Sequence, residues 1–248
     1  MTLGVVIPVY RGIATIGGVV EALYRFSEAR RLMCRVVLVE DMSGDGSREE
    51  VLKLAARHTG GTTVLPERNV GQQRALLMGL EQLKDCDMVA TMDDDGAHPV
   101  ELLDALMEGI RQGAELCYAV PVRKGYSPLR RTGSLLRDFL FSVSTGKPRG
   151  VRVSAYRVMT GDLARRLRAE PDGFGYLSAA AFAHRPRASF VTYEEGPQAV
   201  SSYTLSKLLR LYAGLVLHYT PLKALYKMKA AAECPRAVLE GRGTLWQP

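Results

Sequence analysis

The chain has 248 residues, of which 47% are hydrophobic and 24% are charged. This composition is typical of a globular protein, and the length suffices for one α/β domain with a sizeable core. The longest apolar stretch, over residues 211–217, is far shorter than the roughly 20 residues that a membrane-spanning helix needs. Because the chain also begins directly with a strand-like run, the sequence predicts neither a spanning helix nor a signal peptide.

The net charge of +7 is concentrated in the middle of the chain, where residues 122–168 include twelve basic residues and two acidic ones. Such a field suits nucleic acid, phosphate-bearing ligands or anionic lipid. Nucleic acid is the weakest of these interpretations, because the basic stretch carries no recognisable reader motif and few aromatic residues. The four cysteines are scattered without a Cys-x-x-Cys pair, which indicates buried thiols in a reducing compartment.

The first half of the chain alternates short apolar runs with amphipathic segments of helical period. This alternation predicts an α/β fold, with a mostly parallel sheet and helices on both of its faces. The apolar runs predict strands over residues 3–8, 36–39, 62–65, 88–92 and 114–120. Helical spacing predicts helices over residues 16–26, 48–57, 73–83 and 100–111.

The second half of the chain has a less regular pattern. It predicts helices over residues 129–143 and 162–167 and strands over residues 150–159 and 189–193. Two amphipathic helices with several lysines follow, over residues 203–217 and 221–229. We therefore expect a catalytic domain over residues 1–200 and a helical tail over residues 201–248. The tail either lies on an anionic membrane surface or packs against the domain or a second subunit.

The run Asp93-Asp94-Asp95 directly follows the predicted strand 88–92. In an open α/β sheet, the carboxyl end of a strand faces the crevice where ligands bind. Three adjacent carboxylates repel one another, and a hard divalent cation such as Mg²⁺ or Mn²⁺ would compensate them. The alternative is a solvated acidic turn that caps the next helix.

Three further segments follow predicted strands and are expected at the same edge of the sheet. They are Pro8-Val9-Tyr10, the turn from Asp41 to Ser47, and the stretch from Arg68 to Ala75. Together with the acidic run, and in this order, they resemble the family 2 inverting glycosyltransferases of the GT-A (Rossmann-like) fold. The resemblance is closest to the polyprenyl-phosphate sugar transferases of the dolichol-phosphate mannose synthase type. It extends over about residues 3–225, and includes Ser154-Ala155-Tyr156-Arg157 and the segment 201–209.

The resemblance implies a metal-dependent site. Asp93 and Asp95 would bind Mg²⁺ or Mn²⁺, which neutralises the charge that develops on the leaving diphosphate. Asp41 would accept a hydrogen bond from the nucleobase, although a plain turn is the alternative for this residue. The expected contacts with the nucleotide-sugar are Pro8, Val9, Tyr10, Asp41, Ser43, Asn69, Gly71, Gln72, Asp93, Asp94 and Arg131. The expected catalytic residues are Asp93, Asp94, Asp95 and Arg157, and the arginines suit phosphate recognition.

The chain departs from the family pattern at several positions. Gly96-Ala97 stand where relatives usually carry Leu-Gln, and Gly196 and Ala199 replace an Arg and a Gly. A segment that is often acidic in relatives is basic here, over residues 147–150. A hydroxyl acceptor must lose a proton as it attacks, whereas a phosphate acceptor is already anionic and needs cations more than a base. The absence of this acidic residue therefore favours a lipid phosphate over a hydroxyl as the acceptor of the sugar.

These observations predict an enzyme that transfers a sugar from a nucleotide-sugar, with UDP favoured over GDP, to a polyprenyl phosphate. We expect it in the cytoplasm, or bound peripherally to the inner face of the membrane through the tail. The alternative role of the tail is to form a homo-oligomer. One alternative acceptor is a hydroxyl of a soluble glycan, peptide or small molecule. Another alternative is a degenerate member that binds nucleotide-sugar without turnover.

Overall fold

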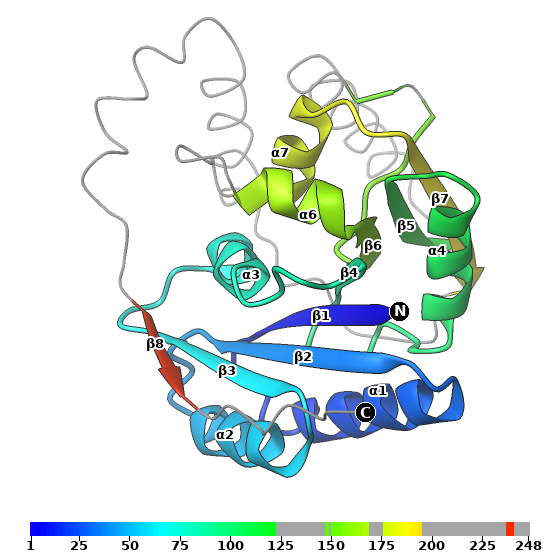
Figure 1. The fold of residues 1–248 in the computed structure, drawn as a ribbon. Coiled ribbons are helices and arrows are strands. Elements are labelled where there is room, and N and C mark those ends of the chain that lie inside the picture. The colour runs from blue at the N-terminus through cyan, green and yellow to red at the C-terminus, as the bar shows by residue number, and fades with distance from the viewer. Residues whose placement is uncertain (123–146, 149, 169–175, 195–236, 241–248) are drawn as a thin grey trace, which may run out of the picture.

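The computed structural model describes residues 1–122, 147–148, 150–168, 176–194 and 237–240. Within these residues, eight strands form one sheet in the order β7-β5-β6-β4-β1-β2-β3-β8 (Figure 1). The central strands are β1 (Thr2–Val9), β2 (Met33–Glu40), β3 (Gly61–Pro66) and β4 (Met88–Thr91). The outer strands are β5 (Leu116–Val122), β6 (Arg157–Thr160), β7 (Ala188–Glu194) and β8 (Ala237–Glu240).

The sheet is mostly parallel. Strand β1 pairs in parallel with β2 and β4, β2 pairs in parallel with β3, and β5 pairs in parallel with β7. Two strands run the other way: β6 lies antiparallel between β4 and β5, and β8 is antiparallel to β3. The predicted α/β fold with a mostly parallel sheet is confirmed.

Helices cover both faces of the sheet, as predicted. Helices α1 (Ile16–Ala29), α2 (Ser47–Arg57) and α4 (Leu102–Arg111) contribute to one apolar core. Helices α3 (Gln72–Leu80), α6 (Gly161–Arg168) and α7 (Leu177–Ala183) contribute to the core on the opposite face. Figure 1 shows α1 and α2 on one side of the central strands and α3 on the other.

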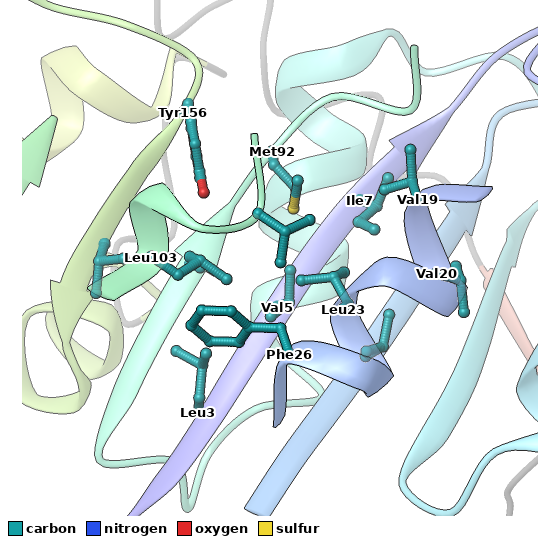
Figure 2. Packing of buried hydrophobic residues seen from close by; sticks show 14 of the residues in the cluster. Leu3, Val5, Ile7, Val19, Val20, Leu23, Phe26, Met92, Leu103 and Tyr156 are labelled. Atoms are coloured by element: carbon teal, nitrogen blue, oxygen red, sulfur yellow. The ribbon is translucent and has the colours of Figure 1, made fainter. Parts of the chain in front are cut away.

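Strand β1 shows why a parallel strand reads as an unbroken apolar run. Leu3, Val5 and Ile7 belong to the first core and Val6 to the second, and all four are fully buried. Figure 2 shows the first three next to the side chains of helix α1. The same cluster continues to Met92 and Tyr156, so the residue directly before the acidic run is part of the core.

The second half of the chain differs from the prediction in three respects, the first being that helix α7 was not predicted at all. The strand expected over residues 150–159 is confined to β6, and β8 is a strand within the segment expected to be a helical tail. The helices predicted over residues 129–143, 203–217 and 221–229 lie outside the described residues. Within the described part, no helix combines the length and the hydropathy that crossing a membrane would require.

Candidate active site

The carboxyl ends of β1, β2 and β4 lie at one edge of the sheet because these neighbouring strands are parallel and in register. The loops that follow them start at Tyr10, Asp41 and Met92. This edge is where open α/β sheets bind ligands. The loop that leads into helix α3 joins the same region, since its backbone contacts Asp41.

Asp93 is held by two side chains from different parts of the chain. The Nε2 atom of Gln72, at the start of α3, donates a hydrogen bond to Asp93 Oδ1 at 2.6 Å. The Nδ1 atom of His98 accepts a hydrogen bond from the Asp93 backbone N–H at 3.0 Å, which closes the acidic turn. His98 is itself buried and stacks on Tyr156, with ring centroids 4.8 Å apart. Gln72 therefore orients the Asp93 carboxylate, while His98 fixes the backbone of the same residue.

The other two carboxylates of the run have different surroundings. Asp94 Oδ2 accepts a hydrogen bond from the backbone N–H of Tyr10 at 3.0 Å. Asp95 is exposed, and its Oδ1 atom accepts a hydrogen bond from the Ala97 N–H at 2.9 Å, as is typical of a turn. Three adjacent residues of one type thus have three distinct roles in the local structure.

Burial and the neighbouring charges disfavour the ionised forms of Asp93 and Asp94. Burial raises the pKa of Asp93, and the charge of Asp95 raises it further, while His98 and Arg157 act in the opposite direction. Burial likewise raises the pKa of Asp94 to about 6, with contributions from both neighbouring carboxylates. A cation bound at this turn would relieve that strain.

The donor set at the turn suits a divalent cation. Carboxylate oxygens are the ligands that Mg²⁺ and Mn²⁺ prefer. Among the described residues, no group of three or more His, Cys, Asp and Glu side chains is arranged to hold a metal ion. Binding through one or two carboxylates, completed by water and substrate phosphates, is the usual arrangement for Mg²⁺ and requires no such group.

The loop after β1 is fixed by side chains from the two neighbouring loops. The backbone N–H groups of three consecutive residues donate to side-chain oxygens: Tyr10 to Asp94, Arg11 to Ser43 at 2.9 Å, and Gly12 to Ser47 at 3.1 Å. The ring of Tyr10 is half exposed, and the Arg11 guanidinium lies 5.4 Å from its centroid. An exposed aromatic ring on a fixed backbone is suited to stacking against a flat ligand group.

Asp41 acts as an anchor for the loop before α3. Its two carboxylate oxygens accept hydrogen bonds from the backbone N–H groups of Val70 at 2.6 Å and Gly71 at 2.7 Å. The side-chain amide of Asn69 donates to the Asp41 carbonyl at 2.8 Å. Burial raises the pKa of Asp41, and the two backbone hydrogen bonds oppose that rise. The nucleobase contact expected of Asp41 would therefore share this carboxylate with the loop.

Arg157 is a buried residue of β6 with an exposed fraction of 2%. Its Nε atom donates to Thr91 Oγ1 at 3.0 Å, and its Nη1 atom donates to Ser178 Oγ at 2.5 Å. Its charge also lowers the pKa of Asp93. The guanidinium thus supports the strand beneath the acidic run, whereas the sequence interpretation assigned it to a substrate phosphate.

The remaining predicted residues are placed as follows. Pro8 and Val9 are buried within β1, and Val9 is part of the core, so neither side chain reaches the surface of the loop. Ser43 is buried and orders the Arg11 backbone. Asn69, Gly71 and Gln72 lie together at the start of α3. Arg131 lies outside the described residues.

Sequence reasoning missed Gly12 and the contacts that Ser47 and His98 make. Their contacts join loops that are far apart in the chain or fold back within a turn, and no local pattern signals them. Lys147, which we counted among cations for the acceptor, is buried and donates to the Val151 carbonyl at 2.5 Å.

Solved structures of two sugar-phosphoglycerate synthases share this architecture. Glucosyl-3-phosphoglycerate synthase from Mycobacterium tuberculosis superimposes with a TM-score of 0.65 at 16% identity, covering 89% of this chain and 81% of that chain. Mannosyl-3-phosphoglycerate synthase from Rubrobacter xylanophilus gives a TM-score of 0.60 at 15% identity, covering 95% of this chain and 77% of that chain. The class of protein is therefore that of the GT-A fold.

The sequence comparisons identify the family. The pattern described as "Glycosyl transferase family 2" matches residues 4–167. A relative from Edwardsiella ictaluri, named undecaprenyl-phosphate 4-deoxy-4-formamido-L-arabinose transferase, is 32% identical over 230 residues, which cover 90% of this chain and 70% of the relative. A protein of the same name from Pseudomonas paraeruginosa is 34% identical, covering 90% of this chain and 67% of that protein. The chain belongs to glycosyl transferase family 2 and is a glycosyltransferase, as the resemblance predicted.

Proposed function

We propose that this enzyme transfers a sugar from a nucleotide-sugar to a polyprenyl phosphate on the cytoplasmic face of the membrane. The similarity to the undecaprenyl-phosphate sugar transferases carries the proposal, because it spans 90% of the chain rather than the nucleotide-binding half alone. UDP is favoured over GDP as the donor nucleotide. A structural neighbour of the same fold was solved with Mn²⁺ and UDP-glucose, which supports this choice.

In this proposal the loops at the carboxyl edge of the sheet bind the donor. Tyr10 would stack on the nucleobase, and the loop held by Asp41 would cover the nucleoside. Asp93 and Asp95 would hold Mg²⁺ or Mn²⁺, which stabilises negative charge on the leaving diphosphate when it is bound. Gln72 and His98 would keep Asp93 oriented for that task, since both contact it directly.

A phosphate acceptor fits the residues around the acidic run. An anionic phosphate oxygen attacks without first losing a proton, so the acceptor requires no general base. The basic residues between 122 and 168 would attract such an acceptor, and Arg131 remains our candidate for its phosphate. Residues 201–248 would form the membrane-proximal or dimer-forming part, with β8 returning to the sheet.

The test is a nucleotide-release assay on the full chain with Mn²⁺. The donors are a panel of UDP- and GDP-sugars that includes the 4-deoxy-4-formamido-L-arabinose donor, each with and without a short-chain polyprenyl phosphate in detergent. We expect rapid release of UDP with one donor only when the lipid is present. The Asp95→Asn variant serves as the inactive control.

Two other results would contradict the proposal in different ways. Slow release that is indifferent to the lipid would indicate a hydroxyl acceptor on a glycan, peptide or small molecule. Nucleotide binding without release from any donor would indicate a family member that binds the donor without turnover.

A further inference from the structure

The carboxylate of Asp94 lies against the loop that follows β1. It accepts the hydrogen bond of the Tyr10 backbone N–H at 3.0 Å, across 84 positions of sequence. Gly12, two residues further along the loop, is buried directly beside it. A Cβ atom at Gly12 would lie 2.3 Å from Asp94 Oδ2, a distance that no side chain tolerates without displacing the carboxylate. The Asp94 carboxylate therefore fills the space that a side chain at position 12 would need.

The hydrogen bond between Tyr10 and Asp94 joins the loop after β1 to the acidic turn after β4. The N–H groups of Arg11 and Gly12 are bound by Ser43 and Ser47, both from the loop after β2. The N–H of Tyr10 is bound instead by the acidic turn after β4. Any displacement of the turn is thus transmitted to the backbone that carries the Tyr10 ring.

We infer that Asp94 is a positioning residue that couples the acidic turn to the Tyr10 loop, so that binding at one favours binding at the other. The inference rests on the proposed function, in which the turn holds a divalent cation and the loop contacts the nucleobase. Coupling between two sites is reciprocal: if Mn²⁺ raises the affinity for UDP, UDP raises the affinity for Mn²⁺ by the same factor. In the proposed complex, part of that factor would come from direct contact between the diphosphate and the cation, and part would come through the Asp94–Tyr10 hydrogen bond.

The test measures the UDP affinity of the full chain by calorimetry, once in EDTA and once in saturating Mn²⁺. The quantity compared between variants is the affinity in Mn²⁺ divided by the affinity in EDTA. We expect Asp94→Ala to lower this ratio by about fivefold, because the hydrogen bond is lost while the metal–diphosphate contact remains. Asp94→Asn retains an oxygen acceptor for the Tyr10 N–H and is the matched control. It should keep the ratio within about twofold of the wild type, although its charge is lost.

Gly12→Ala tests the same contact from the other side. The added methyl group should displace the Asp94 carboxylate and lower the ratio as Asp94→Ala does. In the double variant Gly12→Ala/Asp94→Ala the effects should not add, since both changes remove one contact. Circular dichroism of each variant verifies that the fold is retained.

Three outcomes would overturn the inference. If Asp94→Ala leaves the ratio unchanged while the wild type responds to Mn²⁺, Asp94 does not couple the two loops, and the proposed function stands. If Asp94→Asn lowers the affinity ratio as much as Asp94→Ala does, the coupling depends on the charge of Asp94 rather than on its hydrogen bond. If the wild type binds neither UDP nor GDP, the proposed function fails and the inference fails with it.

Discussion

At the scale of single residues, the acidic run shows that neighbours rather than residue type decide what a carboxylate does. Asp93 is oriented by Gln72 and His98, Asp94 binds the Tyr10 backbone, and Asp95 remains exposed. The exposed carboxylate is the one best placed to exchange its water for a cation and a substrate phosphate. Asp93 and Asp94 are partly buried, which raises their pKa values, and both are held by hydrogen bonds.

Asp95→Asn should therefore abolish turnover without disturbing the fold. The substitution removes a charge from the proposed metal site, and we expect the rate to fall by about a hundredfold or more. Because Asp95 makes a local turn contact with Ala97, the free energy of unfolding should change by less than about 0.5 kcal/mol. Steady-state kinetics and urea unfolding measure the two effects. Full activity in this variant would remove Asp95 from the metal site.

Asp41→Ala should affect both stability and donor binding. Truncation leaves the N–H groups of Val70 and Gly71 without their acceptor, which costs about 1–3 kcal/mol in the free energy of unfolding. The loop before α3 should also loosen, and UDP affinity measured by calorimetry should fall. Asp41→Asn keeps one acceptor oxygen and should lie between the variant and the wild type. Unchanged stability in Asp41→Ala would mean that the loop does not depend on this carboxylate.

At the scale of elements, helix α3 lies so close to the sheet that one position requires glycine. A Cβ atom at Gly79 would lie 2.3 Å from Val6 Cγ1, whereas one at Gly18 in helix α1 would meet nothing within 4 Å. Both positions would gain helix propensity on substitution by alanine. Comparing the two therefore separates packing from propensity.

Gly79→Ala should destabilise the protein by about 1–3 kcal/mol, because the methyl group forces α3 away from β1. Gly18→Ala should instead stabilise it by about 0.5–1 kcal/mol, since the side chain projects into open space. Urea unfolding of the two variants beside the wild type measures both changes. Equal effects at the two positions would contradict the close approach of α3.

Helices α1 and α2 are joined by an ion-pair cluster whose strength depends on pH. His58 Nε2 donates to Glu21 Oε1 at 3.2 Å, and Arg57 Nη1 donates to the same oxygen at 3.0 Å. These hydrogen bonds, with His58 the larger contributor, hold the pKa of Glu21 below its ordinary value of 4.5. A carboxylate with a lowered pKa stabilises the fold fully above its unfolded-state pKa and loses that contribution as the pH falls through the folded-state pKa.

Glu21→Gln should therefore lower the unfolding temperature at pH 6, and the difference from the wild type should shrink as the pH falls below 4.5. Glu28 is exposed on the same helix and its side chain makes no hydrogen bond within the described residues, so Glu28→Gln is the matched control. Its unfolding temperature should follow that of the wild type at every pH. A difference for Glu21→Gln that persists unchanged to pH 3.5 would show that the cluster is not ionic.

At the scale of the whole molecule, the sequence predicts the first half of the fold well and the second half poorly. Strands β1 to β4 each contain an apolar run and alternate with periodic helices, so local pattern suffices to predict them. Strands β6 and β8 have four residues each, and their antiparallel places depend on partners far away in the chain. No local signal carries that information.

The candidate site was likewise predictable from the sequence only in part. The rule that strand ends meet at one edge brought Tyr10, Asp41 and the acidic run together from sequence alone. It could not tell which side chains face a ligand. Val9 packs into the core and Arg157 is buried beneath the acidic run, while Gly12 and His98 contribute contacts that their own neighbours in sequence do not indicate.

The central claim is that the sugar is transferred to the phosphate of a polyprenyl phosphate. Its most direct test is mass spectrometry of the lipid extracted after incubating the full chain with Mn²⁺, the donor and a short-chain polyprenyl phosphate. We predict a new lipid whose mass exceeds that of the acceptor by one glycosyl group, absent with Asp95→Asn and absent with the matching dephosphorylated prenol. An unchanged lipid, alongside donor turnover, would contradict the account.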